Sequence, residues 1–151
     1  MPEINRSLEN VGIGFAAFLA PPGPEVIRFT VGQPDFDTPQ PIVDEAKAAL
    51  DRGETTYTRT QGSVELCNAV ALHLSSHDIV VDPSDVVITP GCKQAILYSM
   101  MATLDAGDEV LLLSPAWPSY DGMLKLLDCK PVHVPVKREN YHPDFNALEN
   151  A

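Results

Sequence analysis

The chain has 151 residues, of which 44% are apolar and 21% are charged, a composition typical of a soluble globular protein. Its formal net charge of −11 argues against nucleic acid or an anionic membrane surface as a partner. The three cysteines (Cys67, Cys92 and Cys129) form no C-x-x-C pair, which favours a reducing compartment over a disulfide scaffold. The apolar run at 11–22 is too short to span a bilayer, so we expect a cytoplasmic protein.

The first part of the chain is expected to be largely irregular. Residues 1–30 include a Pro-Pro-Gly-Pro run that breaks any helix begun before it. A short apolar strand is predicted at 26–31, ending at Gly32, and a loop rich in proline and aspartate follows at 33–41. Regular helical structure is therefore expected only after about the first forty residues.

Two helices are predicted next. Thr38 is placed to cap the first, with Pro39 at its first position and Gly53 at its end. A polar loop rich in threonine separates the two helices at 54–61. Ser63 is the expected cap of the second helix, whose apolar residues recur at helical spacing.

From Asp85 onward the pattern alternates between strand and helix. The predicted elements are strands at 86–89, 109–114 and 130–136 and helices at 92–104 and 118–127. Successive βαβ units of this kind indicate an α/β fold with a parallel sheet and right-handed crossovers. Three strands with an open edge make a poor complete sheet, and the last residues look like the start of a helix. We therefore expect a fragment of a longer chain.

One strand-turn-helix junction predicts an anion site. The run TPGCKQAILY, residues 89–98, follows the predicted strand at 86–89 and passes through a Pro-Gly turn directly into a helix. Such a junction places backbone N–H groups around one point at the positive end of a helix dipole. Phosphate is the usual occupant of such a point, although the junction alone is common among α/β proteins.

Five motifs occur in a fixed order along the chain. They are VGQPDFDTP (31–39), TTYTRTQG (55–62), ITPGCKQAI (88–96), GDEVLLLSPAWPSY (107–120) and PVHVPV (131–136). Together they resemble the N-terminal part of the class I/II, fold type I, pyridoxal-phosphate aminotransferases, and most closely the aspartate aminotransferase branch. The resemblance implies a partial three-layer α/β/α fold with a mostly parallel sheet. It also implies pyridoxal 5'-phosphate as cofactor, an amino acid and a 2-oxo acid as substrates, and a homodimer.

The resemblance assigns roles to particular residues. The turn at Gly91, Cys92 and Lys93 matches the family's cradle for the cofactor phosphate. Trp117 matches the aromatic residue that stacks on the pyridine ring, a role that suits a flat indole face. Tyr57 matches a tyrosine that reaches across the dimer to the partner subunit's phosphate. We expect these five residues to bind the cofactor.

Substrate contacts and domain limits follow from the same resemblance. Gly32 matches a glycine near the substrate carboxylate, and Ile13 belongs to a segment that can lie over the active site. Residues 1–39 are expected to form an N-terminal arm and a segment of the small domain, and 40–151 the N-terminal part of the large cofactor-binding domain. The Schiff-base lysine of the family lies farther downstream, so Lys93 is not assigned that role. No catalytic residue is expected within this chain, which we predict to be inactive alone.

Parts of the sequence are compatible with other functions. A carbon–sulfur lyase or another fold type I enzyme would carry the same motifs. A nucleotide-binding module would use the G-x-G-x-x-A pattern at 12–17 with Asp35, but no strand precedes that pattern. His73 and His77, four residues apart, lack a third metal ligand, so no metal site is expected. Turn and cap chemistry explains Asp35 and Asp37 better than acid–base catalysis.

Overall fold

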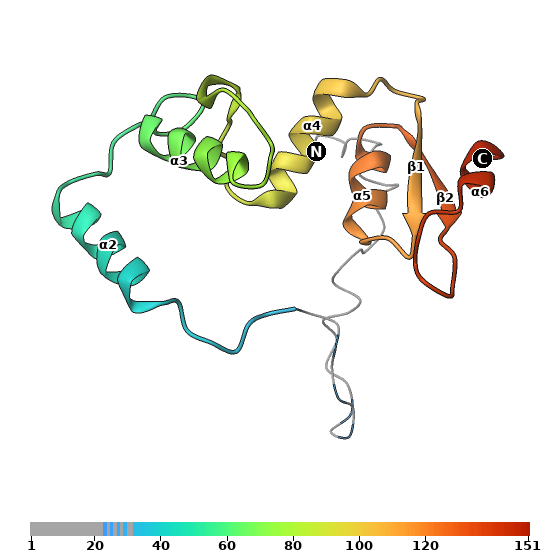
Figure 1. The fold of residues 1–151 in the computed structure, drawn as a ribbon, viewed down its shortest axis with the longest axis horizontal. Coiled ribbons are helices and arrows are strands. Elements are labelled where there is room, and N and C mark those ends of the chain that lie inside the picture. The colour runs from blue at the N-terminus through green and yellow to red at the C-terminus, as the bar shows by residue number, and fades with distance from the viewer. Residues whose placement is uncertain (1–22, 24, 26, 28, 30–31) are drawn as a thin grey trace, which may run out of the picture. The chain divides into compact units, whose positions relative to one another are not determined.

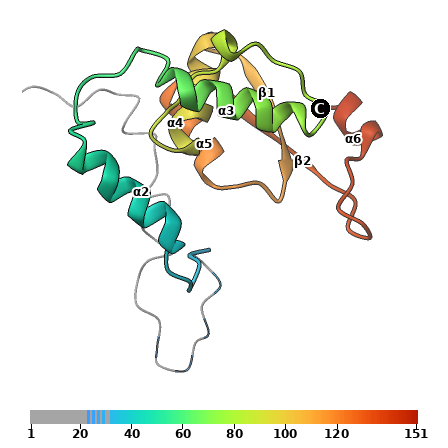
Figure 2. The same ribbon diagram turned by 60° about the vertical axis from the view of Figure 1, so that its left-hand side comes forward.

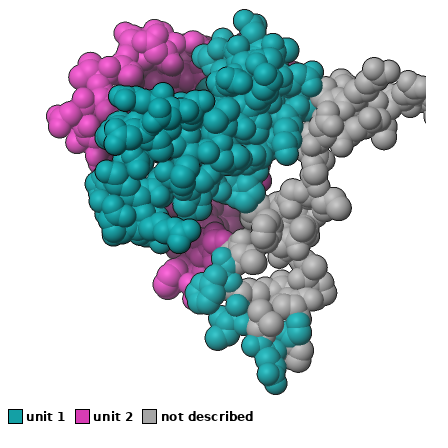
Figure 3. Space-filling model, turned by 90° about the vertical axis from the view of Figure 1, so that its right-hand side faces the viewer, with its two compact units in different colours: residues 1–30, 96–151 teal, residues 31–95 magenta. Residues whose placement is uncertain are grey.

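The computed structural model describes residues 23, 25, 27, 29 and 32–151. Its elements (Figures 1 and 2) are the α-helices α2 (Gln40–Asp51), α3 (Val64–Ser75), α4 (Cys92–Thr103), α5 (Ser119–Leu126) and α6 (Phe145–Glu149), the 3-10 helix η2 (Pro83–Asp85) and the strands β1 (Glu109–Ser114) and β2 (Lys130–Pro135). The strand expected at 26–31 lies mostly outside the described residues. The chain divides into two compact units, coloured in Figure 3. Unit 1 comprises 1–30 and 96–151, and unit 2 comprises 31–95.

Unit 1 contains a βαβ motif. β1 and β2 pair in parallel, with the register running from Glu109 opposite Lys130 to Ser114 opposite Pro135. α5 connects them and lies beside the pair in both views (Figures 1 and 2). This confirms the predicted parallel pairing, because two parallel strands need a crossover and a helix is the usual one.

The core of unit 1 is built between the strands and the helices. Leu112 of β1, Leu124 of α5 and Cys129 form its buried centre. Met100 and Leu104 from the end of α4 pack against this centre. Burial and the nearby carboxylates of Asp108, Asp128 and Asp105 raise the pKa of the Cys129 thiol. Cys129 is therefore a packing residue and not a reactive thiol at neutral pH.

Unit 2 is organised around α3. The Ser63 hydroxyl accepts a hydrogen bond from the Leu66 N–H at 3.2 Å, which confirms the predicted cap. Cys67 and Ala71 of α3 are buried against Val86, which follows η2. Partly buried apolar residues surround this centre, namely Val70, Val81 and Ile88. The unit therefore has its own small core.

The first helix of unit 2 begins differently from the prediction. Thr38 was the expected cap and Pro39 the first helical residue, but α2 starts at Gln40 and Pro39 is the residue before it, with no side-chain cap. The ψ angle of Pro39 is 134°, which is extended, so this residue stays outside the helix. Pro41 then occupies the first turn, where a missing N–H costs nothing.

The run at 86–89 was predicted as a strand and is not one in this structure. Val86 has an extended backbone, with φ −89° and ψ 127°, but the described residues offer the run no ladder partner. Instead the Ile88 N–H donates to the Gln61 carbonyl at 2.8 Å. Extended residues form a strand only when a neighbour supplies the alternating ladder, and one backbone hydrogen bond to a loop is not a ladder.

A glycine is required where these two segments meet. Gly62 has φ +108°, and a Cβ atom added there would lie 2.7 Å from Ile88 Cγ1 and 2.8 Å from Ile88 Cβ. Neither the backbone angle nor the space suits an L side chain. Gly53, at φ +75°, faces open space. Substitutions at these two glycines can therefore separate the energetic cost of a side chain at positive φ from the cost of a clash with Ile88.

We expect Gly62→Ala to lower the free energy of unfolding by about 3 kcal/mol, through the strained φ together with the clash. Gly53→Ala serves as the matched control and carries the backbone cost alone, about 1 kcal/mol. Urea denaturation followed by far-ultraviolet circular dichroism measures both. Equal losses in the two variants would contradict the close contact between Gly62 and Ile88.

Candidate functional site

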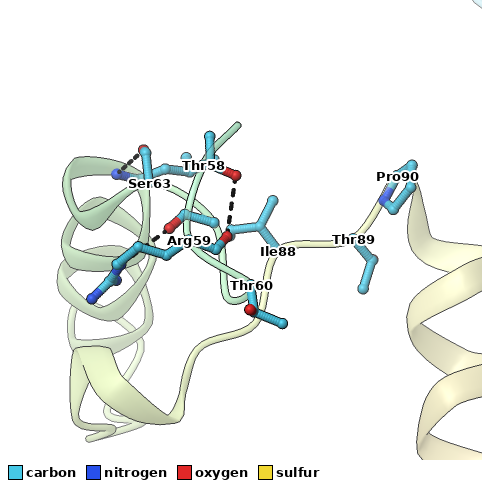
Figure 4. Close-up of a pocket in the computed structure, with 9 residues that line it drawn as sticks. Thr58, Arg59, Thr60, Ser63, Ile88, Thr89 and Pro90 are labelled. Atoms are coloured by element: carbon cyan, nitrogen blue, oxygen red, sulfur yellow. Dashed lines mark hydrogen bonds between the residues drawn. The ribbon is translucent and has the colours of Figure 1, made fainter. Parts of the chain in front are cut away.

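In unit 2, the motif at 55–62 lies next to the first part of the motif at 88–96. The Gln61 side chain donates from Nε2 to the Ser84 carbonyl at 2.7 Å, and the Gln61 carbonyl accepts from the Ile88 N–H. Between the two segments lies an open hollow of about 370 Å³ (Figure 4). It is lined by Thr58, Arg59, Thr60, Gly62, Ser63, Leu66, Ile88, Thr89 and Pro90. The threonine-rich loop therefore borders the turn that leads into α4.

That turn has the backbone arrangement of a helix start. Gly91 has φ +96°, and its carbonyl accepts from the Gln94 N–H at 3.2 Å and the Ala95 N–H at 3.3 Å. The Gly91 N–H is used within the turn, donating to the Thr89 carbonyl at 2.7 Å. No described residue accepts a hydrogen bond from the N–H of Cys92, the first residue of α4. Among the described residues, the N–H of Cys92 is therefore the donor that this turn leaves without an acceptor, whereas that of Gly91 is used within the turn.

The side chains of this turn leave it accessible. Gly91, Cys92 and Lys93 are all exposed, and a Cβ added at Gly91 would meet no atom within 4 Å. Lys93 is the second residue of α4, three residues after Pro90, which lines the hollow. A backbone donor at the positive end of a 12-residue helix, open to solvent, is suited to a dianionic group.

Tyr57 lies in the same threonine-rich loop and is fully exposed. It does not line the hollow, which begins at Thr58. An aromatic side chain with a polar tip, left uncovered by its own unit, is available to a group outside that unit. The structure thus places Tyr57 in the loop beside the turn, with its ring exposed to solvent.

Trp117 belongs to unit 1 and is described separately. It follows β1 and a cis Ser114–Pro115 peptide bond, and it is half-buried. Its ring meets the edge of Tyr120 in a T-shaped arrangement, with centroids 5.5 Å apart. Edge-to-face contact with one neighbour orients an indole while leaving part of its surface accessible. Trp117 is therefore neither fully buried nor fully exposed, and its ring contacts Tyr120.

The two residues expected near the substrate stand differently. Gly32 is exposed, and a Cβ atom added there would have open space around it. Ile13 lies outside the described residues, as does the glycine-rich pattern at 12–17. His73 and His77 form an edge contact with ring centroids 5.0 Å apart, and no metal-binding cluster occurs in the part of the chain that the structure describes.

Sequence reasoning missed one cluster of polar side chains. In unit 1 the Ser114 Oγ lies 2.8 Å from His133 Nδ1, and His133 Nε2 lies 2.9 Å from Asp121 Oδ1. The three residues have no common spacing in the chain. Only the register of β1 with β2 and the position of α5 bring them together. No local sequence pattern could therefore predict this cluster.

Among the helices that the structure describes, none has both the length and the apolar character needed to cross a membrane.

Comparison with known proteins gives a consistent result. Residues 24–151 match the family "Aminotransferase class I and II". The aspartate aminotransferase of Sulfolobus acidocaldarius is 41% identical over 132 residues, covering 85% of this chain and 33% of that protein. A (5-formylfuran-3-yl)methyl phosphate transaminase of Methanocaldococcus jannaschii is 35% identical over 121 residues, covering 80% of this chain and 33% of that protein.

Solved structures agree with the sequence matches. The aspartate aminotransferase of Thermus thermophilus with maleate superposes with a TM-score of 0.89 at 32% identity, covering 100% of this chain and 42% of that one. The predicted α/β fold class is confirmed by this likeness and by the parallel βαβ motif. The chain spans about a third of the length of the curated relatives it matches. It belongs to the class I and II aminotransferase family, which depends on pyridoxal phosphate.

Proposed function

We propose that this chain is part of an aminotransferase that moves an amino group from an amino acid, such as aspartate, to a 2-oxo acid. The single observation that carries the proposal is the turn before α4. There an exposed helix start, in which no described residue accepts the backbone N–H of Cys92, follows Gly91 directly. This donor set fits the phosphate of pyridoxal phosphate, because a dianion is stabilised by main-chain amides and the helix dipole without any formal positive charge.

Each site residue has a distinct task in this proposal. Gly91 keeps the approach to the turn free of a side chain, Cys92 donates its N–H to the phosphate, and Lys93 lies at the rim of the same turn. Trp117 offers an indole face to the ring, and its edge contact with Tyr120 fixes that face. The bound cofactor supplies the electron sink that the reaction requires.

The remaining parts of the proposal concern the whole protein. We assign Tyr57 to the phosphate of a second subunit in a homodimer, supported by its full exposure in a loop beside the turn. Gly32 and Ile13 are assigned to the substrate side. Residues 1–39 are proposed as the N-terminal arm and small-domain segment, and 40–151 as part of the large domain. The free cysteines support a cytoplasmic location.

Members of the family are named for different substrates. Its relatives include proteins named for aspartate and a protein named for a furan phosphate, at similar identity to this chain. No observation favours a carbon–sulfur lyase. The family match over 24–151 favours the aminotransferase over the nucleotide-binding alternative, whose glycine-rich pattern at 12–17 lies outside the described residues.

We expect pyridoxal phosphate to slow alkylation of Cys92 by iodoacetamide severalfold, because a phosphate bound at the turn would cover the exposed thiol. The buried thiols of Cys67 and Cys129 should react only when the chain is unfolded. Mass spectrometry of the tryptic peptides measures each rate separately.

Pyridoxal without phosphate is the matched ligand control, and Cys92→Ser confirms which thiol is measured. Equal protection by pyridoxal and by pyridoxal phosphate would place the phosphate elsewhere and overturn the proposed cradle.

The 151-residue chain should form no glutamate from aspartate and 2-oxoglutarate above the rate with free pyridoxal phosphate. The resemblance places the lysine that holds the cofactor downstream of the motifs present here, and the chain covers only 33% of the Sulfolobus relative. The longer protein that carries this chain should catalyse the transfer. A coupled dehydrogenase assay measures both, and an active isolated chain would be inconsistent with the division of roles.

Tyr57→Phe in the longer protein should weaken retention of pyridoxal phosphate by about 1.5 kcal/mol, or roughly tenfold in Kd, because one hydrogen bond to a charged group is lost. Fluorescence titration of the cofactor gives the Kd. Tyr141→Phe, a second exposed tyrosine, is the control. Unchanged affinity in the Tyr57 variant would remove Tyr57 from the site.

A further inference from the structure

The segment that carries Trp117 is tied at both ends to one histidine. The segment runs from Ser114, the last residue of β1, to Asp121 in the first turn of α5. The Ser114 Oγ lies 2.8 Å from His133 Nδ1, and the Asp121 Oδ1 lies 2.9 Å from His133 Nε2. A single imidazole on β2 therefore spans the two ends of the segment.

The register of the sheet explains why these three side chains meet. His133 pairs with Leu112, and Ser114 is two residues beyond Leu112, so all three side chains lie on one face of the β1–β2 pair. Leu124 of α5 packs against Leu112 on that face. Asp121 is three residues before Leu124 and thus on the same side of α5. The polar contacts sit at the edge of the apolar contact between the helix and the strands.

The protonation pattern of the cluster follows from its partners. An ionised Asp121 can only accept, so His133 Nε2 carries the proton of that hydrogen bond. His133 Nδ1 then accepts from the Ser114 hydroxyl when the imidazole is neutral. The half-exposed imidazole and the partly buried carboxylate also form an ion pair when the imidazole is protonated, so the Asp121 bond persists in both states.

A nucleophilic role for Ser114 fits the surroundings less well. The order Ser–His–Asp is that of a hydrolytic relay, in which backbone N–H groups beside the nucleophile stabilise the developing charge. The residue after Ser114 is Pro115, which has no N–H to offer. The same three contacts instead account for how the segment is held.

We propose that His133 is a positioning residue that fixes the Trp117 segment by holding its two ends together. The indole is then oriented from two directions, by the edge contact with Tyr120 and by the hydrogen bonds at Ser114 and Asp121. The part of this inference that concerns cofactor stacking rests on the proposed function. The part that concerns the segment's position does not.

Trp117 is the sole tryptophan of the chain, so its fluorescence reports on this segment directly. His133→Ala should shift the emission to longer wavelength and increase quenching by acrylamide. Amide hydrogen exchange at Ala116, Trp117 and Tyr120 should accelerate roughly threefold or more, since half-exposed charged pairs contribute modestly. All these measurements use the 151-residue chain without cofactor.

The decisive comparison places His133→Ala in a chain that already carries Ser114→Ala and Asp121→Ala. If His133 acts through these two partners, its removal there should add almost nothing. His142→Ala, a histidine of the same unit in the loop after β2, is the matched control and should leave the tryptophan signal unchanged.

Three results would overturn the inference: an unchanged tryptophan signal and exchange rate in His133→Ala, an equal effect of His133→Ala in the doubly substituted chain, or a wild-type emission that matches the urea-unfolded chain. If His133→Ala unfolds unit 1, Ser114→Ala decides, because it removes one end of the bridge and leaves His133 in place. Faster exchange confined to the segment then supports the inference, and uniform or absent acceleration refutes it. Failure of cofactor binding with these results intact would refute the proposed function alone.

Discussion

The contact between Gly62 and Ile88 is the constraint on which the candidate site depends. A side chain at position 62 would overlap Ile88, and the backbone at Gly62 has a φ of +108°. The neighbouring Gln61 receives the Ile88 N–H, so two segments more than twenty residues apart are fixed at one point. This contact places the threonine-rich loop beside the turn that opens α4. Without it, Thr58 and Thr89 would not border the same hollow.

The phosphate site proposed here uses the main chain and not formal charge. A chain with a net charge of −11 would repel an anion at long range, yet a helix start presents local positive potential through its N–H groups. Gly91 contributes the absence of a side chain, and Cys92 contributes the donor. Because the Gly91 N–H is already bonded to Thr89, the turn is held in shape before any ligand arrives. Such a site needs little rearrangement to bind, which favours affinity.

The two segments to which we assign cofactor contacts are stabilised by different means. The turn before α4 is shaped by local backbone hydrogen bonds between residues two to four apart. The Trp117 segment is held by residues far apart in the chain, because His133 must arrive from β2 to meet Ser114 and Asp121. The backbone hydrogen bonds of the turn depend only on neighbouring residues. The hydrogen bonds of His133 to Ser114 and Asp121 can form only after β1 and β2 have paired in their parallel register.

The sequence by itself determined the elements whose signals are local. The Ser63 cap, α4, the β1–β2 pair and the crossover α5 followed from capping residues, periodicity and unbroken apolar runs. The turn at Gly91 and the family were likewise readable from ordered motifs. Tertiary structure decided what no local pattern encodes: that 86–89 is not a strand although Val86 is extended, that Gly62 lies against Ile88, and that His133 joins Ser114 to Asp121. Strand pairing and side-chain contact depend on which distant backbone arrives alongside, and that is fixed by packing and register, not by any short run of residues.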